Sequence, residues 1–202
     1  MKKCLIFATR SQDKAREVRA MLPDWDILTL DDIGFLGDII ETGSTFEENA
    51  YIKAETVYAF AEGFPVLADD SGLIIDYLDG EPGVRSKRFL GEDTPYYAKN
   101  RKILDMMRGV PEEERTCRFV CTMVLLSPSG KNEIVNGVLE GEIATRIAGD
   151  GGFGYDPIFF VPEKGCTTAQ MSPEEKHAIS HRGKALREMA AALEKIRTEE
   201  KL

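Results

Sequence analysis

Two kinds of apolar pattern recur along the chain. Short continuous apolar runs predict buried strands, and apolar residues spaced three and four apart predict amphipathic helices. The last such stripe, Leu186, Met189, Leu193 and Ile196, lies on one side of a predicted helix. Strands are expected at 3–8, at 27–30, on either side of 69–72, and at 118–127, 131–138, 142–146 and 158–162.

Capping residues mark where several helices begin. The segment 44–48 (STFEE) contains two overlapping capping boxes, and Ser172-Pro173-Glu174-Glu175 is another with proline at the first helical position. Helices are therefore expected at 13–22, from 44–48 to 62, at 94–109, from 173 onward and at 181–198.

Strands that alternate with helices, together with a hairpin at 118–138, indicate an α/β fold with a central mixed β-sheet flanked by helices. The chain has 202 residues and contains no internal repeat, low-complexity tract or linker rich in proline and serine. A single domain over 1–202 is therefore expected.

The charge balance is acidic, with 35 Asp and Glu against 26 Lys and Arg and a net charge of −9. A protein that grips polymeric nucleic acid usually carries a basic stripe, so this balance argues against such a partner but not against a free nucleotide. The five-residue apolar run near the N-terminus is too short for a signal peptide, and no segment approaches 18 apolar residues. We expect no membrane association and a cytoplasmic location.

The four cysteines are widely spaced and form no C-x-x-C pair. Cys117 and Cys121 lie four apart in a predicted strand and would face the same side. Buried free thiols are the favoured interpretation, and a zinc site is the alternative.

Polar residues interrupt the apolar pattern in five places, the first at Thr9–Lys14, where a strand joins a helix. Free backbone N–H groups and the positive end of the helix dipole make such a turn suitable for an anion, and Ser11 and Lys14 would add a hydroxyl and a charge. The alternative is a helix cap followed by a surface lysine, and this segment alone favours it.

The second place is Asp69-Asp70, which follows an apolar run and precedes a predicted turn. Two carboxylates at a strand end suit a divalent cation, although adjacent strand residues face opposite sides. An ordinary Asp-Ser-Gly turn is an equally good interpretation.

The third place is 41–53, where Asn49 and Lys53 are four apart and share one helix face, with Glu41 preceding the helix. Glu41 could reach the Asp69 and Asp70 strand end. A solvated helix face is the alternative.

The fourth place, 149–157, has four glycines, which suit a close backbone approach to a ligand or a series of tight turns. Phe153 and Tyr155 are candidates to stack on a base. The fifth, EEKHAISHR, gathers Lys176, His181 and Arg182, which could recognise a phosphate or a purine edge.

Together, five ordered motifs resemble the inosine triphosphate pyrophosphatase family, and the resemblance extends over essentially the whole chain. The motifs are ETGSTFEENAYIKA (41–54), ADDSGL (68–73), PGVRSKRF (82–89), GGFGYDPIFF (151–160) and EEKHAISHRGKAL (174–186). The resemblance implies an elongated two-lobed α/β protein with an active-site cleft between the lobes, and a homodimer. It also implies Mg²⁺-dependent hydrolysis of deaminated purine nucleoside triphosphates (ITP, dITP and XTP) to the monophosphate and pyrophosphate.

By position, the resemblance implies that Asp70 is the proton acceptor and a metal ligand, with Glu41 near the metal; Asp69 is a third metal candidate from its place in the strand. On the phosphate side it implies Thr9, Arg10, Ser11, Gln12, Asp13, Lys14, Asn49, Lys53 and Ser71. On the nucleobase side it implies Phe153, Gly154, Tyr155, Asp156, Lys176, His181 and Arg182.

The first motif departs from the family pattern, because Arg10 and Ser11 stand where that pattern has glycine and asparagine. The departure leaves an alternative open, a nucleotide-binding sensor with impaired catalysis. A weaker alternative is a phosphatase or kinase-like transferase, which would cleave a different bond.

Overall fold

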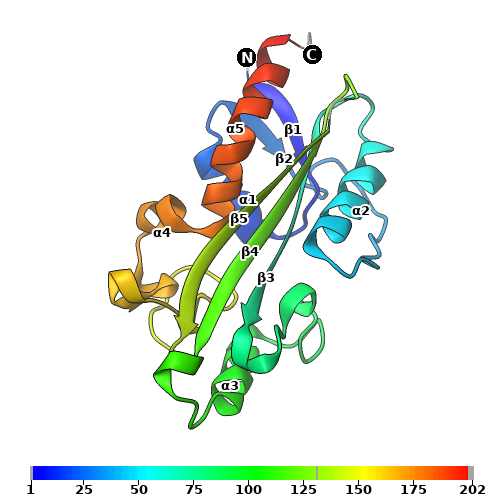
Figure 1. Cartoon of the computed structure of the whole chain (residues 1–202). Coiled ribbons are helices and arrows are strands. Elements are labelled where there is room, and N and C mark those ends of the chain that lie inside the picture. Colours follow the sequence, from blue (N-terminus) through cyan, green and yellow to red (C-terminus); the bar gives the residue numbers. More distant parts are fainter. Residues whose placement is uncertain (1, 131, 200–202) are drawn as a thin grey trace. The chain divides into compact units, whose positions relative to one another are not determined.

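A computed structural model of the chain describes residues 2–130 and 132–199 (Figure 1). A seven-stranded sheet has the order β2-β1-β3-β4-β5-β6-β7. Strand β1 pairs in parallel with β2 and β3, whereas β6 pairs antiparallel with β5 and β7, so the mixed sheet and the α/β class are confirmed. The strands are Lys3–Phe7 (β1), Trp25–Leu28 (β2), Val66–Ile75 (β3), Thr116–Leu126 (β4), Asn132–Ile143 (β5), Phe159–Val161 (β6) and Cys166–Thr167 (β7).

The chain divides into two compact units. Unit 1 consists of Met1–Asp70, Cys121–Gly137 and Arg182–Leu202, and unit 2 consists of Ser71–Val120 and Val138–His181. The division falls inside β3, β4 and β5, so each of these strands contributes to both units. Met1, Lys131 and 200–202, which the expected single domain and hairpin include, lie outside the described residues.

Unit 1 has three layers, because its strands are apolar on both faces. Leu5 and Phe7 of β1 pack in one cluster with helices α1 (Gln12–Met21) and α5 (His181–Glu199). Ile6 and Ala8, which point the other way, pack in a second cluster with α2 (Phe46–Tyr58). Helices α1 and α5 thus cover one face of the unit 1 strands and α2 covers the other, as Figure 1 shows.

Unit 2 has its own core. Strand ends Leu73–Ile75, Cys117–Phe119 and Leu139–Ile143 pack with Ile103 and Met107, from α3 (Tyr96–Met106) and its C-cap. The other helix of this unit is α4 (Pro173–Ile179), which begins at the predicted Ser172 capping box. Six short 3₁₀ segments lie among the described residues, and one of them, Asp156–Ile158, begins at the end of the segment 149–157, which we name the glycine-rich loop.

The structure corrects the expected turn at 69–72. The two predicted runs are one ten-residue strand, β3, and both Asp69 and Asp70 lie inside it and are buried. The turn preference of Asp-Ser-Gly is overridden because both carboxylates find cationic partners, which offset the cost of burying them.

Smaller corrections concern element ends. β2 starts at Trp25 because Trp25 pairs with Lys3, and α2 ends at Tyr58, before the predicted glycine cap. α3 is preceded by Pro95 as its N-cap residue, and the predicted strand at 142–146 is the end of β5. β7 was not predicted. Within the described residues, no helix is both long and apolar enough to cross a bilayer.

Candidate active site

Asp70 lies on the face of β3 that is covered by α2. Val66 and Ala68, four and two residues before it, pack against the same helix, so the alternation of the strand fixes this orientation. Lys53 Nζ donates to Asp70 Oδ1 at 2.9 Å, and Asn49 Nδ2 donates to Asp70 Oδ2 at 3.4 Å. The shared helix face of Asn49 and Lys53 therefore points at Asp70.

Glu41 joins this group from the segment before α2. Its Oε1 lies 3.3 Å from Lys53 Nζ, so Glu41 and Asp70 share one ammonium group. Gly43 allows the segment to approach the helix closely: its N–H donates to Asn49 Oδ1 at 2.8 Å, and a Cβ there would lie 2.6 Å from Glu48 Cβ. We name Glu41, Asn49, Lys53 and Asp70 the carboxylate cluster.

Burial and charge act in opposite directions on the carboxylate cluster. Burial raises the pKa of Asp70, and the neighbouring Glu41 carboxylate adds to this, while Lys53 and Lys14 lower it. Burial alone would lower the pKa of Lys53, but the carboxylates of Asp70, Asp69 and Glu41 outweigh burial and raise that pKa. The cluster is thus a partly desolvated site whose carboxylate oxygens are of the type that a divalent cation prefers.

Asp69, one residue earlier, lies on the other face of β3. Its Oδ1 accepts from Lys14 Nζ at 2.9 Å, and its Oδ2 accepts from Arg182 at 3.1 Å. Arg182 also donates to Glu17 at 2.6 Å, and both partners of this pair are buried. We name Lys14, Glu17, Asp69 and Arg182 the ionic network.

The opposite charges of the ionic network shift the pKa values of its members strongly. Burial by itself would raise the pKa of Asp69, but Lys14 and Arg182 lower it far below its ordinary range. Burial opposes the charge of Arg182, yet Asp69 and Glu17 raise its pKa. Because both oxygens of Asp69 are bound by these cations, the structure does not join Asp69 to Glu41 and Asp70, the two residues with which it was expected to hold a metal.

Arg182, which was expected to read the nucleobase, belongs to this network, and its contact with a base stays a prediction. Its side chain is 2% exposed and its guanidinium is committed to two carboxylates of unit 1. Glu17 was missed by the sequence interpretation. The available signal was a charged residue between the inward-facing Ala15 and Val18 of α1.

The turn at 9–14 behaves mainly as a helix start. Ser11 is the N-cap of α1 and its Oγ accepts from Lys14 N at 3.3 Å, while Thr9 Oγ1 accepts from Ser11 N at 3.1 Å. Gln12 is exposed, and Asp13 forms a surface ion pair with Arg16 at 3.0 Å. Of this segment, the structure joins only Lys14 to the carboxylates of β3.

Arg10 points to a different segment. Its guanidinium donates to the carbonyl oxygens of Phe35 (3.1 Å) and Gly37 (2.8 Å) and lies 3.4 Å from Asp31. It therefore fastens the segment 31–37 to the end of β1, which explains what an arginine does at this position. The expected phosphate contact of Arg10 gains no support from this arrangement.

Unit 2 contains a second polar group, centred on Asp156. Its Oδ2 accepts from Lys176 Nζ at 2.6 Å and from Phe153 N at 2.7 Å, and its Oδ1 accepts from Thr168 Oγ1 at 2.8 Å. Lys176 Nζ lies 4.7 Å from the centre of the Phe153 ring. Gly152 has a φ of +65°, and a Cβ at this position would collide with the Asp156 carboxylate. We name Phe153, Asp156, Thr168 and Lys176 the aspartate hub; Thr168 was not predicted.

Tyr155 does not share the expected stacking role of Phe153. Its ring is 4% exposed and meets Tyr96 edge to face at 5.2 Å, and its hydroxyl donates to Ser86 O at 2.7 Å. Phe153 is only partly buried and remains the stacking candidate. His181 is buried and stacks on Phe119 at 4.8 Å, and Ser71 is half-buried in β3.

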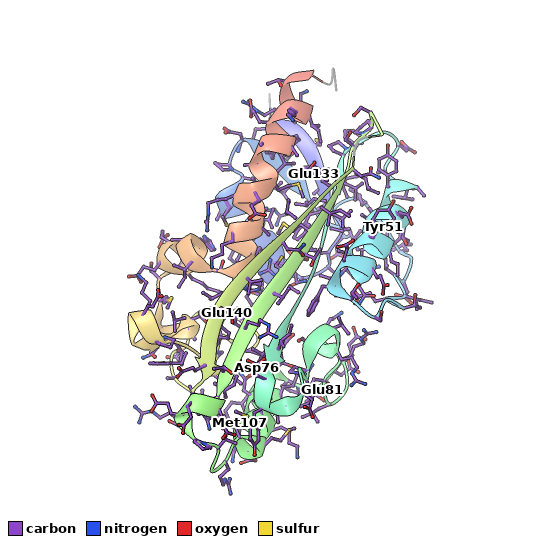
Figure 2. The ribbon with its side chains drawn as sticks, in the orientation of Figure 1. Tyr51, Asp76, Glu81, Met107, Glu133 and Glu140 are labelled. Atoms are coloured by element: carbon purple, nitrogen blue, oxygen red, sulfur yellow. The ribbon has the colours of Figure 1, made fainter. Side chains whose placement is uncertain are left out.

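A separate hollow of about 410 Å³ lies along α2. It is lined by Thr42, Gly43, Glu47, Glu48, Tyr51 and Ile52, and Figure 2 labels Tyr51 on this helix. Asn49 and Lys53 are not among the lining residues, so the hollow is not part of the carboxylate cluster.

The four cysteines are free thiols, as expected. Burial, and to a smaller extent the charge of Asp69, raises the pKa of Cys121 to about 12, and Cys117 is shifted in the same direction, chiefly by burial. Among the described residues, no group of three or more His, Cys, Asp or Glu side chains could by itself hold a metal ion.

Comparison with known proteins places these features in context. A family model described as the Ham1 family matches residues 5–192. The dITP/XTP pyrophosphatase of Geobacter sulfurreducens is 50% identical over 184 residues, covering 90% of this chain and 92% of that protein. The dITP/XTP pyrophosphatase of Bacillus licheniformis is 45% identical over 192 residues, covering 94% and 97%.

Solved structures of Ham1 proteins resemble the fold of this chain. The Ham1 protein of Staphylococcus aureus has a TM-score of 0.83 and 39% identity, covering 95% of this chain and 98% of that chain. The HAM1 protein of Coxiella burnetii has a TM-score of 0.84 and 39% identity, covering 96% and 100%.

Proposed function

Because the chain belongs to the Ham1 family, we propose that it is a nucleoside triphosphate pyrophosphatase that hydrolyses dITP, ITP and XTP to the monophosphate and pyrophosphate. The relatives named dITP/XTP pyrophosphatase match it over nearly its whole length. The observation that carries the proposal is the carboxylate cluster, in which Glu41 and Asp70 share the Lys53 ammonium.

The carboxylate cluster fits Mg²⁺, with Glu41 and Asp70 as the ligands. Mg²⁺ is usually held by one or two carboxylates together with substrate phosphates and water, so a site with only two carboxylates suits it. Bound there, Mg²⁺ would offset phosphate charge and polarise the phosphoryl group. Asp69 is left out of the proposed ligand set because Lys14 and Arg182 bind both of its oxygens.

The charged side chains of unit 1 would bind the triphosphate. Lys14 lies in the first turn of α1 and Lys53 next to Asp70, so each brings an ammonium close to the β3 carboxylates. The first N–H groups of α1 add donors for phosphate oxygens. In this account Lys53 also keeps Glu41 and Asp70 close together.

Asp70 would act as the general base. One of its carboxylate oxygens would accept a proton from a water that attacks the α-phosphorus, and pyrophosphate would leave. Burial raises the pKa of this carboxyl group, which makes the carboxylate a stronger base than an exposed aspartate. Asn49 would orient the carboxylate through its hydrogen bond to Oδ2.

The aspartate hub would recognise the base. Phe153 offers a ring face for stacking, and Lys176, held by Asp156, offers an ammonium donor beside it. Hypoxanthine and xanthine carry a 6-oxo acceptor where adenine carries an amino donor. A donor left facing another donor costs about 1–3 kcal/mol, enough to favour deaminated purines about tenfold to a hundredfold.

The finer parts of the proposal are a homodimer, a cytoplasmic location and action on free nucleotides rather than polymeric nucleic acid. The net charge of −9 supports the last of these. The orientation of Arg10 toward 31–37 favours an enzyme over an impaired sensor, because the unusual arginine leaves the carboxylate cluster intact.

Product analysis tests the proposal. The purified protein is incubated with ITP, dITP, XTP, GTP and ATP, with Mg²⁺ or with a chelator, and the products are separated by ion-exchange chromatography. We expect IMP and pyrophosphate from ITP with Mg²⁺, and far less turnover of ATP. Formation of IDP and phosphate, or equal turnover of ITP and ATP, would contradict it.

A further inference from the structure

The glycine-rich loop is held from α3 by a buried side chain that no motif predicted. Asn100 is 2% exposed, and its Nδ2 donates to Gly154 O at 3.0 Å. Gly154 has a φ of +67°, and a Cβ at this position would lie 3.6 Å from the ring of Tyr96. Tyr96 and Asn100 are four apart, so one face of α3 contacts the loop between Phe153 and Tyr155.

The segment 82–89, one of the five motifs, has no role in the proposed chemistry, yet it anchors the same loop. Tyr155 donates from its hydroxyl to Ser86 O at 2.7 Å, and Lys99 of α3 donates to the next carbonyl oxygen, that of Lys87. Ser86 Oγ in turn accepts from Leu73 N at 2.9 Å. The segment therefore links α3, the glycine-rich loop and β3 within unit 2.

The buried amide of Asn100 stabilises the fold less than an apolar side chain of similar size would. Among residues 2–130 and 132–199, no hydrogen-bond partner reaches Asn100 Oδ1, although the atom is buried. An unpaired buried acceptor destabilises a protein relative to an apolar side chain of similar size. The hydrogen bond to Gly154 O is thus the distinctive contribution of this residue.

We propose that Asn100 and Tyr155 are positioning residues that set the purine selectivity of the enzyme by fixing the backbone of 153–156. This inference rests on the proposed function, in which Phe153 and Lys176 contact the base. Phe153 N and Lys176 Nζ both bind Asp156 Oδ2, so a displaced loop would move the stacking ring and the ammonium donor together. The phosphate-binding side chains of unit 1 make none of these hydrogen bonds, so turnover of bound substrate should change little.

Tyr155→Phe is the primary test, because it removes one hydroxyl and keeps the ring that packs on Tyr96; Asn100→Ala is the second. Tyr97→Phe is the matched control, since Tyr97 lies on the same helix and is 63% exposed. Steady-state kcat and KM are measured for ITP and ATP with Mg²⁺, together with Tm. We expect Tyr155→Phe and Asn100→Ala to raise the KM for ITP about fivefold to tenfold and to lower the ITP-to-ATP ratio of kcat/KM by a similar factor. We expect kcat for ITP to stay within about twofold, and Tyr97→Phe to match the wild type.

Variants with a lower Tm but an unchanged KM and an unchanged ITP-to-ATP ratio would show a purely structural role and overturn the inference. If Asn100→Ala does not fold, Tyr155→Phe alone decides. A wild-type protein that releases no pyrophosphate from ITP would instead refute the proposed function, and this inference with it, so the two failures are distinguishable.

Discussion

Asp69 and Asp70 are adjacent in β3, yet their carboxylates serve opposite faces of the strand. Asp70 binds Lys53 of α2 at 2.9 Å, and Asp69 binds Lys14 of α1 at the same distance. Asp69 is shielded almost completely, at 1% exposed, and Asp70 is 6% exposed. The two residues therefore have different roles: Asp69 binds the cations of the ionic network, and Asp70 is the proposed reactive group.

The first prediction concerns Asp69→Asn. Removing this charge leaves the buried Arg182 and the half-buried Lys14 with one carboxylate fewer, which should cost about 3–5 kcal/mol in the free energy of unfolding. Urea denaturation followed by circular dichroism measures the loss. Asp13→Asn is the control, because it breaks a surface ion pair of α1, the helix that carries Lys14, and should cost within about 0.5 kcal/mol. Equal losses in the two variants would contradict the structural role of Asp69.

The same variant has a pH signature. The pKa of Asp69 is lowered on folding, so its charge contributes stability above the unfolded value of 3.8, and that contribution is lost as the pH falls below it. The difference between wild type and Asp69→Asn should be constant from neutral pH down to about pH 5 and shrink at more acidic pH.

The second prediction is that Ser11→Asn leaves activity unchanged or raises it. Ser11 caps α1, and asparagine caps a helix about as well, so Tm should not change. The longer amide can reach a phosphate directly where serine would need a bridging water, which costs up to about 2 kcal/mol. The readout is kcat/KM for ITP. A tenfold fall with an unchanged Tm would show that serine is a specific adaptation.

The third prediction concerns the glycine-rich loop. Gly152→Ala imposes a left-handed backbone on alanine, at about 1–2 kcal/mol, and also pushes its Cβ into the Asp156 carboxylate. We expect a lower Tm and a raised KM for ITP. Gly165→Ala is a close control, because Gly165 has nearly the same φ, +63°, and open space around the added Cβ. A KM increase of the same size in both variants would refute the proposed role of the aspartate hub.

The sequence predicted helices well where it carries a clear local signal, such as the Ser172 capping box that begins α4 or the apolar stripe of α5. It failed at 69–72 because a turn preference is local, whereas the ion pairs that keep β3 extended there come from helices far away in the chain.

The same distinction holds for the candidate site. Asn49 and Lys53 could be placed together from helical spacing, and both do reach Asp70. The pairing of Arg182 with Glu17 joins residues 165 positions apart, and no local sequence pattern predicts it. The contact of Asn100 could not be predicted for a similar reason, because its partner is a backbone carbonyl of another segment.

The fourth prediction concerns the cysteines. Cys117 and Cys121 are buried, and burial raises the pKa of Cys121 to about 12, so neither should form the reactive thiolate at pH 8. Ellman's reagent should titrate at most two thiols in the native protein, those of the half-buried Cys4 and Cys166, and four in denaturant. Loss of a rapidly reacting thiol in Cys121→Ser would contradict the structure.

The central claim is that Asp70 is the general base of pyrophosphate release, and the kcat of Asp70→Asn for ITP at saturating Mg²⁺ tests it most directly. A positioned proton acceptor contributes about 10²–10⁴ in rate, so kcat should fall by at least a hundredfold while the circular dichroism spectrum stays that of the wild type. A folded Asp70→Asn protein that keeps more than about a tenth of the wild-type kcat would contradict it.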